Sequence, residues 1–434
     1  MHYSDTRSFA SSMSLESNNT HLSPCSWYFR AQRSSLSLAI LVALILFTDM
    51  LVYGAVIPCL PLLVLDKFHG TPKDIGILFG CFACGYLMAT PIFAVLSDSY
   101  KNRRYPLMIG SICLISSTLC FSWATNYKLF VMARLCQGVS AGASWTIGLG
   151  MLADAFPNET LGRVMGTVIL AHTIGFVLGP VIGGMLYEYG GMSAPFYFCS
   201  FFGLLTLLGS IWIAEPSPVQ PTLEESTPLM TSRKNELIRL VQHRRILACV
   251  ICCFVTSVAL AGIEPALPIY LSEKYHASTS TIGIIFVSLV IPCFLGLFTG
   301  YLSDKYGRPW FIATGMLVAS VAALLVSLSA KTSLYGMVPF LFLLGLSNPI
   351  VHTPLMPEMG SIVSQMKSTA FAQVYALYNM AYSLGTLVGP LIAGIILSSP
   401  SLGDTSSQFQ ILMLIFSVLL AISFPASIVI IMCK

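Results

Sequence analysis

The sequence predicts an all-α membrane protein with twelve transmembrane helices in two pseudo-symmetric six-helix bundles. Its 434 residues are 56% hydrophobic and 9% charged, whereas soluble domains carry about 25% charged residues. The apolar residues gather in runs long enough for a membrane-spanning helix, which takes about 20 residues. An internal repeat divides these runs into two sets of six.

The first apolar run, residues 36–65, contains one charged residue, Asp49. Pro58 and Pro61 are expected to loosen the later part of this helix, because proline lacks a backbone donor. A carboxylate at the centre of a membrane helix costs roughly 2.5–3.5 kcal/mol on insertion scales. We therefore expect Asp49 to face a bundle interior or a water-filled cavity and not lipid.

Polar segments divide the chain into four parts. Residues 1–35 are rich in Ser and Asn and are expected to form a disordered cytoplasmic tail. Residues 215–245 contain four prolines and five basic residues, so we expect a cytoplasmic linker between an N-terminal bundle (36–214) and a C-terminal bundle (246–434). The predicted helix cores are 36–60, 75–97, 106–125, 129–152, 164–187, 195–214, 246–271, 281–302, 310–329, 334–356, 369–397 and 410–432.

The basic residues predict the orientation in the membrane. With both termini in the cytoplasm, 16 Lys and Arg residues fall on the cytoplasmic side, 5 fall on the other side, and Arg134 lies within a helix. This distribution explains the net charge of +4, which therefore gives no reason to expect nucleic-acid binding. We expect a multi-pass protein of the plasma membrane or of an acidic vesicle or vacuole membrane.

The two halves of the chain repeat a series of landmarks in the same order. Two related six-helix bundles around a central path are typical of secondary transporters. The repeat aligns Pro58 and Pro61 with Pro265 and Pro268, Asp98 with Asp304, Gly138 and Ser140 with Gly345 and Ser347, and Gly175, Gly179 and Pro180 with Gly385, Gly389 and Pro390.

Small residues recur at four-residue spacing in the fifth and eleventh predicted helices. This spacing lets a partner backbone approach closely, and the proline that follows is expected to bend each helix. Either close packing alone or a hinge role explains the pattern. The residues concerned are Gly175, Gly179, Pro180 and Gly183 in the fifth helix and Gly385, Gly389, Pro390 and Ala393 in the eleventh.

Two short loops on the predicted cytoplasmic side place an acid beside arginines. Asp98 precedes Arg103 and Arg104, and Asp304 precedes Arg308. These groups are expected to form ion pairs that latch the cytoplasmic gate and break when it opens. The alternative is that they only fix the topology, because exposed ion pairs contribute under about 1 kcal/mol.

Five ionisable residues lie well inside apolar runs: Asp49, Arg134, His172, Glu264 and His352. Asp49 and Glu264 either carry the transport chemistry or form a structural ion pair. Arg134 either stabilises a carboxylate or only fixes the fold. His172 is interpreted as a packing residue, and both readings stay open for His352. Because Glu264 precedes proline, its helix is expected to be irregular there.

Aromatic and polar residues are expected to line the same region. Tyr53 shares a helix face with Asp49. Tyrosine faces attract cationic ligands, and a polar-aromatic stripe on the eleventh helix would suit a wet cavity. The stripe consists of Tyr375, Asn379, Tyr382 and Thr386.

Several motifs resemble those of the major facilitator superfamily. The segment from Gly300 to Arg308 is similar to the superfamily's signature loop, and Ala94 to Arg104 is a degraded copy of it. Arg134-x2-Gln137-Gly138 and the glycine-rich fifth helix resemble motifs of the drug:proton antiporter branch. The vesicular amine transporters within that branch resemble this chain at DML from Asp49, GMLAD from Gly150, LYE from Leu186, EPALPI from Glu264 and MPEMG from Met356.

The resemblance also identifies departures from the amine transporters. Those proteins match this chain at Asp49, Arg134 and Glu264. Where they carry an acid in helix 10 this chain has His352, and where they carry an acid in helix 11 and a lysine in helix 2 it has Asn379 and Phe82. A less negative cavity would suit a larger, less cationic or neutral solute.

The resemblance implies the major facilitator fold and a proton-coupled antiporter that exports or sequesters an amine, drug or metabolite by alternating access. Its expected partners are protons, a small organic solute and the lipid bilayer, and a monomer is expected to be functional. An uncoupled facilitator of a neutral metabolite and a non-transporting receptor are the alternatives. The sequence has no HExxH, GxSxG or phosphate-binding GxxxxGKS motif, so we expect no enzyme activity, no cofactor and no metal.

Overall fold

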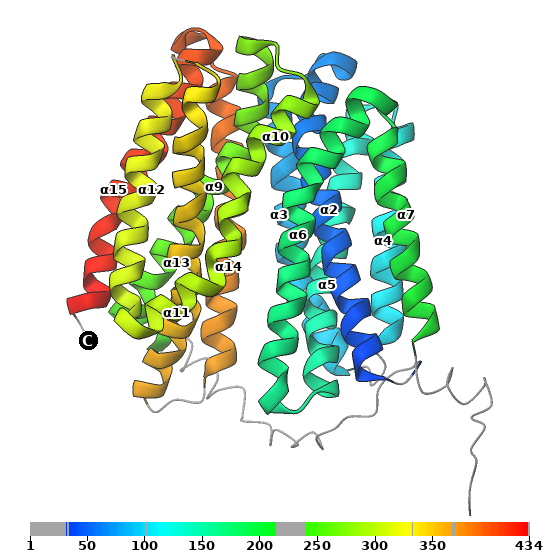
Figure 1. The fold of residues 1–434 in the computed structure, drawn as a ribbon, viewed down its shortest axis with the longest axis vertical. Helices are drawn as coiled ribbons and strands as arrows, with labels where there is room; N and C mark the ends of the chain where they lie inside the picture. Colours follow the sequence, from blue (N-terminus) through cyan, green and yellow to red (C-terminus); the bar gives the residue numbers. More distant parts are fainter. Residues whose placement is uncertain are drawn as a thin grey trace, which may run out of the picture.

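The structure is a computed structural model that describes residues 32, 34–99, 103–213, 239–331, 333–366 and 370–432. Within these residues all regular secondary structure is helical (Figure 1). Nearly all of the predicted tail and most of the predicted linker lie outside the described residues.

The helices confirm the predicted all-α class. Eleven described helices are long and apolar enough to cross a membrane. A twelfth, α5, carries Arg134, Gln137 and many small residues and is correspondingly less apolar. The N-terminal half comprises α2 (Ser35–Phe68), α3 (Pro72–Ser99), α4 (Arg104–Trp123), α5 (Tyr127–Ala155), α6 (Asn158–Gly190) and α7 (Ala194–Trp212).

The C-terminal half repeats this order with one interruption. Its second crossing is divided into α10, the 3-10 turn η1 and α11, at the position of Pro292. The elements are α9 (Arg244–Tyr275), α10 (Thr279–Val290), η1 (Ile291–Leu295), α11 (Gly296–Tyr306), α12 (Arg308–Ser329), η2 (Tyr335–Met337), α13 (Val338–Gln365), α14 (Phe371–Leu397), η3 (Pro400–Leu402) and α15 (Thr405–Met432).

Proline does not interrupt the first helix of either half. α2 continues through Pro58 and Pro61, and α9 continues through Pro265 and Pro268. The expected loosening of α2 and the expected irregularity at Glu264 are therefore wrong. The helical bonds on either side of each proline and the surrounding packing hold the backbone in register, because both helices are central and mostly buried.

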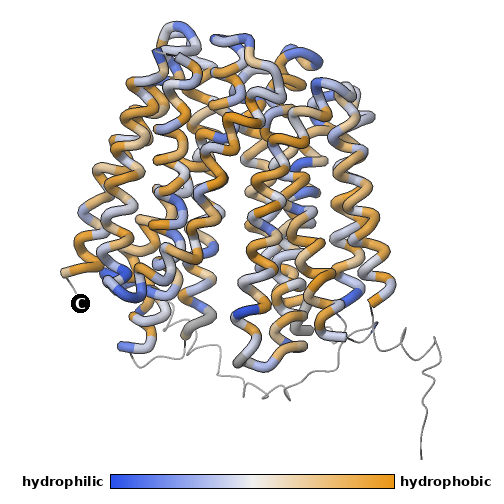
Figure 2. Tube along the Cα trace, viewed as in Figure 1, coloured by the Kyte–Doolittle hydropathy of each residue, from blue (hydrophilic) through white to orange (hydrophobic). Residues whose placement is uncertain are grey.

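The two halves stand side by side (Figure 1). We call the end that carries Arg103, Arg104, Arg163, Arg245 and Arg308 the basic end and the opposite end the distal end. α2 begins and α15 ends at the basic end. Apolar residues dominate the length of the helices, and polar ones concentrate toward the two ends (Figure 2).

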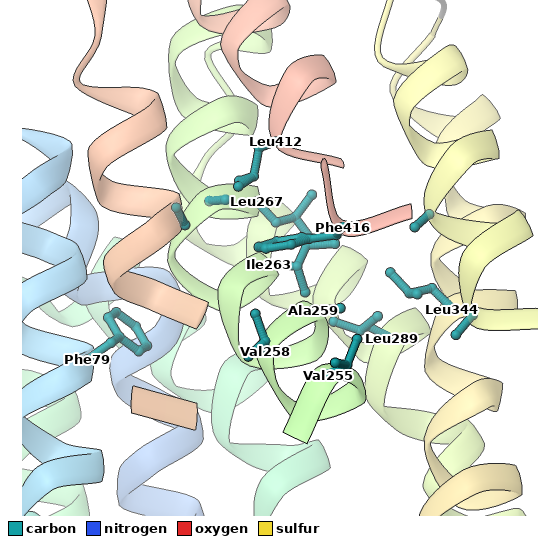
Figure 3. Packing of buried hydrophobic residues seen from close by; sticks show 14 of the residues in the cluster. Phe79, Val255, Val258, Ala259, Ile263, Leu267, Leu289, Leu344, Leu412 and Phe416 are labelled. Atoms are coloured by element: carbon teal, nitrogen blue, oxygen red, sulfur yellow. The ribbon is translucent and has the colours of Figure 1, made fainter. Parts of the chain in front are cut away.

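Close helix contacts follow the predicted glycine pattern in each half. A Cβ at Gly179 of α6 would lie 2.7 Å from the Cα of Gly54 in α2, and a Cβ at Gly389 of α14 would lie 2.8 Å from the backbone N of Gly262 in α9. These pairs confirm the predicted close approach of backbones. Figure 3 shows the core beside the second pair, where Phe416 of α15 lies against Ile263 of α9.

A lysine at the distal end repeats in both halves. Lys67 donates to the carbonyl oxygen of Ala124 at the end of α4 (3.0 Å), and Lys274 donates to that of Ala330 at the end of α12. A cation at a helix C-terminus satisfies a free carbonyl and complements the helix dipole. The internal repeat therefore extends to the lysine contacts that cap the C-terminal ends of α4 and α12.

Hydrogen bonds join the halves at the middle and at the distal end of the described part of the chain. One joins α2 to α9, one joins α3 to α14, and two join α6 to α10. Ring contact between Phe176 of α6 and Phe286 of α10, with centroids 6.4 Å apart, adds to the α6–α10 junction. The halves are thus closed against each other toward the distal end.

Candidate functional site

The candidate site centres on a hydrogen bond between the two halves. The hydroxyl of Tyr53 in α2 donates to the Oε2 atom of Glu264 in α9. Both residues lie in the middle of the first helix of their half, which is the most enclosed place in each bundle. An ionisable side chain therefore takes part in the contact between the halves at the centre of the molecule.

Arg134 of α5 lies beside this pair and forms no ion pair with a carboxylate among the described residues. Its guanidinium group lies over the rings of Phe79, Phe82 and Tyr53, with its central carbon 5.1, 5.6 and 5.8 Å from the ring centroids. The side chain is fully buried. Its Nη1 atom donates to Gln137 (3.2 Å), and its Nε and Nη2 atoms have no hydrogen-bond partner among the described residues.

This arrangement places Tyr53 between a cation and an anion. Its ring faces Arg134, and its hydroxyl binds Glu264. Arg134 and Glu264 lie within electrostatic range of each other. Phe82 of α3 packs on Tyr53 with ring centroids 4.7 Å apart. An apolar ring thus covers one side of the Tyr53–Glu264 contact.

Asp49 lies one turn from Tyr53 toward the basic end of α2 and is 4% exposed. Neither carboxyl oxygen has a hydrogen-bond partner of normal geometry among the described residues, although Ser144 of α5 lies beside it. Tyr86 of α3 lies within electrostatic range. The structure therefore places Asp49 in the interior, as predicted, but in a separate position from Glu264.

His352 of α13 forms a second polar cluster with α14. Its Nδ1 atom lies 3.1 Å from the hydroxyl of Tyr378, and its ring meets that of Tyr382 with centroids 5.5 Å apart. Its Nε2 atom is buried without a partner among the described residues. Because Tyr382 is also within electrostatic range of Glu264, this cluster adjoins the central one.

The predicted stripe on α14 is only partly brought to the site. Tyr382 meets His352, whereas the hydroxyl of Tyr375 lies against Gly360 of α13. Asn379 and Thr386, both half-buried on α14, stay predictions. Sequence reasoning missed Tyr378, which lies four residues before Tyr382 on the face that meets His352. His172 of α6 meets Trp145 edgewise, with centroids 5.2 Å apart, which fits a packing role.

The arginines of the predicted first-half latch bind within their own half. Arg103 pairs with Asp154 at the end of α5 (3.2 Å). Arg104 donates to the backbone carbonyls of Ser210 (2.9 Å) and Ile211 at the end of α7. The side chain of Asp98 lies outside the part of the structure that is described. These contacts hold the basic ends of the helices together.

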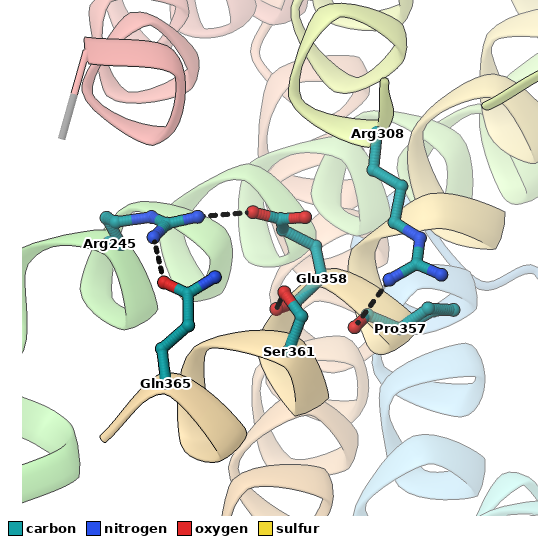
Figure 4. Close-up of polar contacts among 6 residues, drawn as sticks. All are labelled: Arg245, Arg308, Pro357, Glu358, Ser361 and Gln365. Carbon is teal, nitrogen blue, oxygen red and sulfur yellow. Dashed lines mark hydrogen bonds and ion pairs between the residues drawn. The ribbon is translucent and has the colours of Figure 1, made fainter. Parts of the chain in front are cut away.

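The second-half latch also binds within one half. Arg308 pairs with Asp304 (2.7 Å), and its Nη1 atom donates to the carbonyl of Pro357 in α13 (3.2 Å). The Asp304 side chain is 60% exposed. The contact to Pro357 joins the start of α12 to α13 at the basic end (Figure 4).

A buried ion pair near this loop was not predicted. The Nη2 atom of Arg245 lies 2.6 Å from Oε1 of Glu358, and its Nη1 atom donates to Gln365 (2.9 Å; Figure 4). Arg245 was expected in the linker, but α9 begins one residue before it. His243, which precedes α9, has a lowered pKa because of burial and of the nearby charges of Arg245 and Arg239.

The described residues contain no cluster of three or more His, Cys, Asp or Glu side chains that could hold a metal ion.

The sequence profile described as the Major Facilitator Superfamily matches residues 42–356 and 249–433, which together cover nearly the whole chain. The chain belongs to this superfamily.

Among curated relatives, the human synaptic vesicular amine transporter is 30% identical over 326 residues, which are 74% of this chain and 61% of that protein. The human chromaffin granule amine transporter is 30% identical over 328 residues, 75% of this chain and 60% of that protein. The chain thus spans about three fifths of the length of these relatives.

A solved structure supports the fold. A bacterial homologue of the human lysosomal transporter Spinster, in an inward-facing and occupied conformation, superposes with a TM-score of 0.73. It covers 92% of this chain and 97% of its own length, with 16% sequence identity. At that identity the likeness concerns the fold alone.

Proposed function

We propose that this chain is a secondary active transporter, a proton-coupled antiporter that exports or sequesters a small organic solute by alternating access. The hydrogen bond from Tyr53 to Glu264 carries the proposal, because one ionisable group contributes directly to the contact between the two halves. The superfamily membership and the similarity to amine transporters support the solute class.

Competition for the Glu264 carboxylate supplies the coupling. An ionised carboxylate makes a charge-assisted hydrogen bond, which is about twice as strong as a neutral one. A proton on Glu264 removes that charge, and a donor or cationic group on the solute displaces the Tyr53 hydroxyl. Both events weaken the same contact between the halves, so proton and solute exclude each other at one acceptor.

Arg134 and Asp49 set the electrostatic background of this exchange. The uncompensated guanidinium of Arg134 stabilises the ionised form of Glu264 across the ring of Tyr53. The carboxyl group of Asp49, which lies beside Ser144 and has no hydrogen bond of normal geometry among the described residues, is a second acceptor for a proton or a cationic solute. His352, Tyr378 and Tyr382 offer neutral polar and aromatic contacts from the opposite half.

The proposed orientation places the basic end and both termini in the cytoplasm. The distal end then faces the outside of the cell or the lumen of an acidic vesicle or vacuole. With the halves closed at the distal end, the described conformation is the cytoplasm-facing stage of the cycle. The chain is proposed to act as a monomer, with the residues 36–214 and 246–434 as its two moving bodies.

Reconstitution into proteoliposomes with an imposed pH step tests the proposal. A screen of amines, drugs and neutral metabolites identifies a transported solute, and each pH unit supplies about 1.4 kcal/mol per exchanged proton. Gradient-driven accumulation should be lost in Glu264→Gln and Asp49→Asn. Glu273→Gln, which neutralises an exposed distal carboxylate, is the matched control and should transport like the wild type.

One observation favours a second candidate, an uncoupled facilitator of a neutral metabolite. The resemblance implies further acids in the amine transporters where this chain has His352 and Asn379, and the ring of Phe82 packs on Tyr53 and under the guanidinium of Arg134. A facilitator would equilibrate its solute at the same rate with and without the pH step, and the two acid substitutions would leave that flux unchanged.

A further inference from the structure

The polar cluster of α13 and α14 contains a hydrogen-bonding atom that no described residue satisfies. His352 of α13 has its Nδ1 atom 3.1 Å from the hydroxyl of Tyr378 in α14. Its Nε2 atom is buried and has no hydrogen-bond partner among the described residues. Because an unpaired polar atom in the interior is costly, native proteins contain few of them. The Nε2 atom is therefore a candidate contact for a bound molecule.

The proton of the imidazole is assigned to Nε2 by the hydrogen bonds that each tautomer leaves unmade. If the hydroxyl of Tyr378 donates to Nδ1, its own hydrogen has a partner and one N–H group, at Nε2, stays free. If Nδ1 donates instead, the hydroxyl hydrogen of Tyr378 and the lone pair of Nε2 both lack partners in the described part of the chain. The first tautomer leaves fewer polar atoms unpaired and is favoured. His352 thus offers a free donor.

Tyr382 connects this donor to the central site. Its ring meets that of His352 edgewise with centroids 5.5 Å apart, and it lies within electrostatic range of Glu264. The outward face of α14 carries exposed residues at four-residue spacing, Ala376, Met380 and Leu384. Tyr382 lies two residues from the last two, which is nearly the opposite side of a helix, and it is 41% exposed. Its exposed surface therefore faces the interior of the bundle.

We propose that His352 is a specificity-determining residue whose Nε2–H group donates to an acceptor oxygen of the solute, such as a carbonyl oxygen. The proposal rests on the proposed transport function and extends its site from Glu264 to α13. The solute carries a donor or cationic group for Glu264 at one end and an acceptor oxygen at the other, and its body packs on the ring of Tyr382. This exposed ring turns aside to admit the oxygen, since exposed side chains change rotamer within nanoseconds.

Tyr378 is the positioning residue of this contact. Its hydroxyl holds the imidazole in the tautomer that has its proton on Nε2. A protein site with a fixed donor discriminates against a solute that lacks the acceptor, because the donor then stays unpaired in the complex. The preference for an oxygen at this end of the solute is thus a property of His352 and Tyr378 together.

Two amines that differ at one atom test the proposal. 4-Acetylbenzylamine has a carbonyl oxygen that only accepts hydrogen bonds, and 4-isopropylbenzylamine has a methyl group in place of that oxygen. Both carry a cationic amine for Glu264. Titration calorimetry measures their dissociation constants with the full chain in lipid nanodiscs at pH 7.5. We expect the acetyl compound to bind about five-fold more tightly, which is the equivalent of one net hydrogen bond.

Two substitutions distinguish the nitrogen atoms of the imidazole. An asparagine side chain places its amide group near the position of Nδ1, and a glutamine side chain places it near that of Nε2. His352→Asn should therefore abolish the preference for the acetyl compound, whereas His352→Gln should keep most of it. Thermal unfolding of both variants establishes that they are folded.

Tyr378→Phe tests the positioning role by a spectroscopic signature. The two imidazole tautomers differ in their nitrogen shifts in solid-state nuclear magnetic resonance, and His352→Gln identifies the signals of His352 among the seven histidines of the chain. We expect the wild type to carry the proton on Nε2 and Tyr378→Phe to show both tautomers and a weaker preference. Tyr375→Phe removes a hydroxyl on the same helix that lies against Gly360, and this control should change neither.

Equal affinity of the wild type for the two amines would overturn the proposal, and so would a preference that His352→Asn keeps. A wild-type proton on Nδ1 would also contradict it, because Nε2 would then be an acceptor. Failure of the proposed antiport has a separate signature. Solute flux that is indifferent to a pH step would contradict proton coupling, whereas the preference between the two amines would remain in an uncoupled facilitator.

Discussion

Replacing Glu358 by alanine should destabilise the C-terminal half strongly, because it leaves the charge of Arg245 buried without its partner. The side chains of the pair are 3% and 6% exposed, and their atoms approach to 2.6 Å. Removing one member of a buried ion pair costs about 3–5 kcal/mol. Since Gln365 keeps one hydrogen bond to Arg245 (2.9 Å), we expect a loss of about 3 kcal/mol in the free energy of unfolding.

The chain contains an exposed pair at the same end that serves as the control. Asp304 and Arg308 are 60% and 31% exposed and lie 2.7 Å apart, so Asp304→Ala should cost under about 1 kcal/mol. Unfolding by titration with a denaturing detergent, followed by circular dichroism, measures both variants. The double substitution Arg245→Met with Glu358→Met should recover most of the loss, because apolar side chains of similar volume replace such pairs well.

Equal losses for Glu358→Ala and Asp304→Ala would refute this reasoning, because they would mean that burial does not decide the cost of the pair. If the double methionine variant were as unstable as Glu358→Ala, the loss of stability would come from altered packing and not from the unpaired charge of Arg245.

Three further predictions concern packing, capping and pH. Gly179→Ala should destabilise the N-terminal half by about 1–3 kcal/mol, whereas Gly166→Ala, whose Cβ would meet nothing within 4 Å, should leave thermal unfolding unchanged. Lys274→Met should cost about 1 kcal/mol in the free energy of unfolding through loss of the cap on α12, and a loss near zero would show that the contact is not made. Hydrogen bonds from Ser407 lower the pKa of Asp404. The contribution of Asp404 to stability is therefore present above its pKa in the unfolded chain and is lost as the pH falls through its pKa in the folded protein. Ser407→Ala should raise the folded-state pKa of Asp404, measured in a titration by nuclear magnetic resonance.

The number and order of the helices could be predicted because the signals for them are local. Apolar runs of about 20 residues and glycines at four-residue spacing depend on the chain's own sequence and on general limits of the bilayer. The behaviour at Pro58 and Glu264 was predicted wrongly, because packing around a central helix outweighs the loss of single backbone bonds.

The partners of the polar residues were much harder to predict. Tyr53 and Glu264 are 211 residues apart, and Arg245 and Glu358 are 113 residues apart. The sequence of a single chain contains no signal that residues so far apart come into contact. Arg245 follows another arginine and was therefore assigned to the linker, whereas an acid in the apolar run around Glu358 was a signal that could have been used.

The aromatic stripe on α14 shows a similar limit. Two sets of residues, one with Tyr375 and one with Tyr378, share Tyr382 and fit helical spacing. Only the packing of α13 against α14 distinguishes them, because it directs Tyr378 to His352 and Tyr375 to Gly360.

The most direct measurement of the central claim separates solute exchange from pH-driven accumulation in Glu264→Gln. Proteoliposomes are loaded with the solute identified by the screen, and both processes are followed with the same labelled compound. If Glu264 exchanges the coupling proton, the variant should still exchange solute across the membrane but lose accumulation against a pH step. Full accumulation by Glu264→Gln would contradict the account.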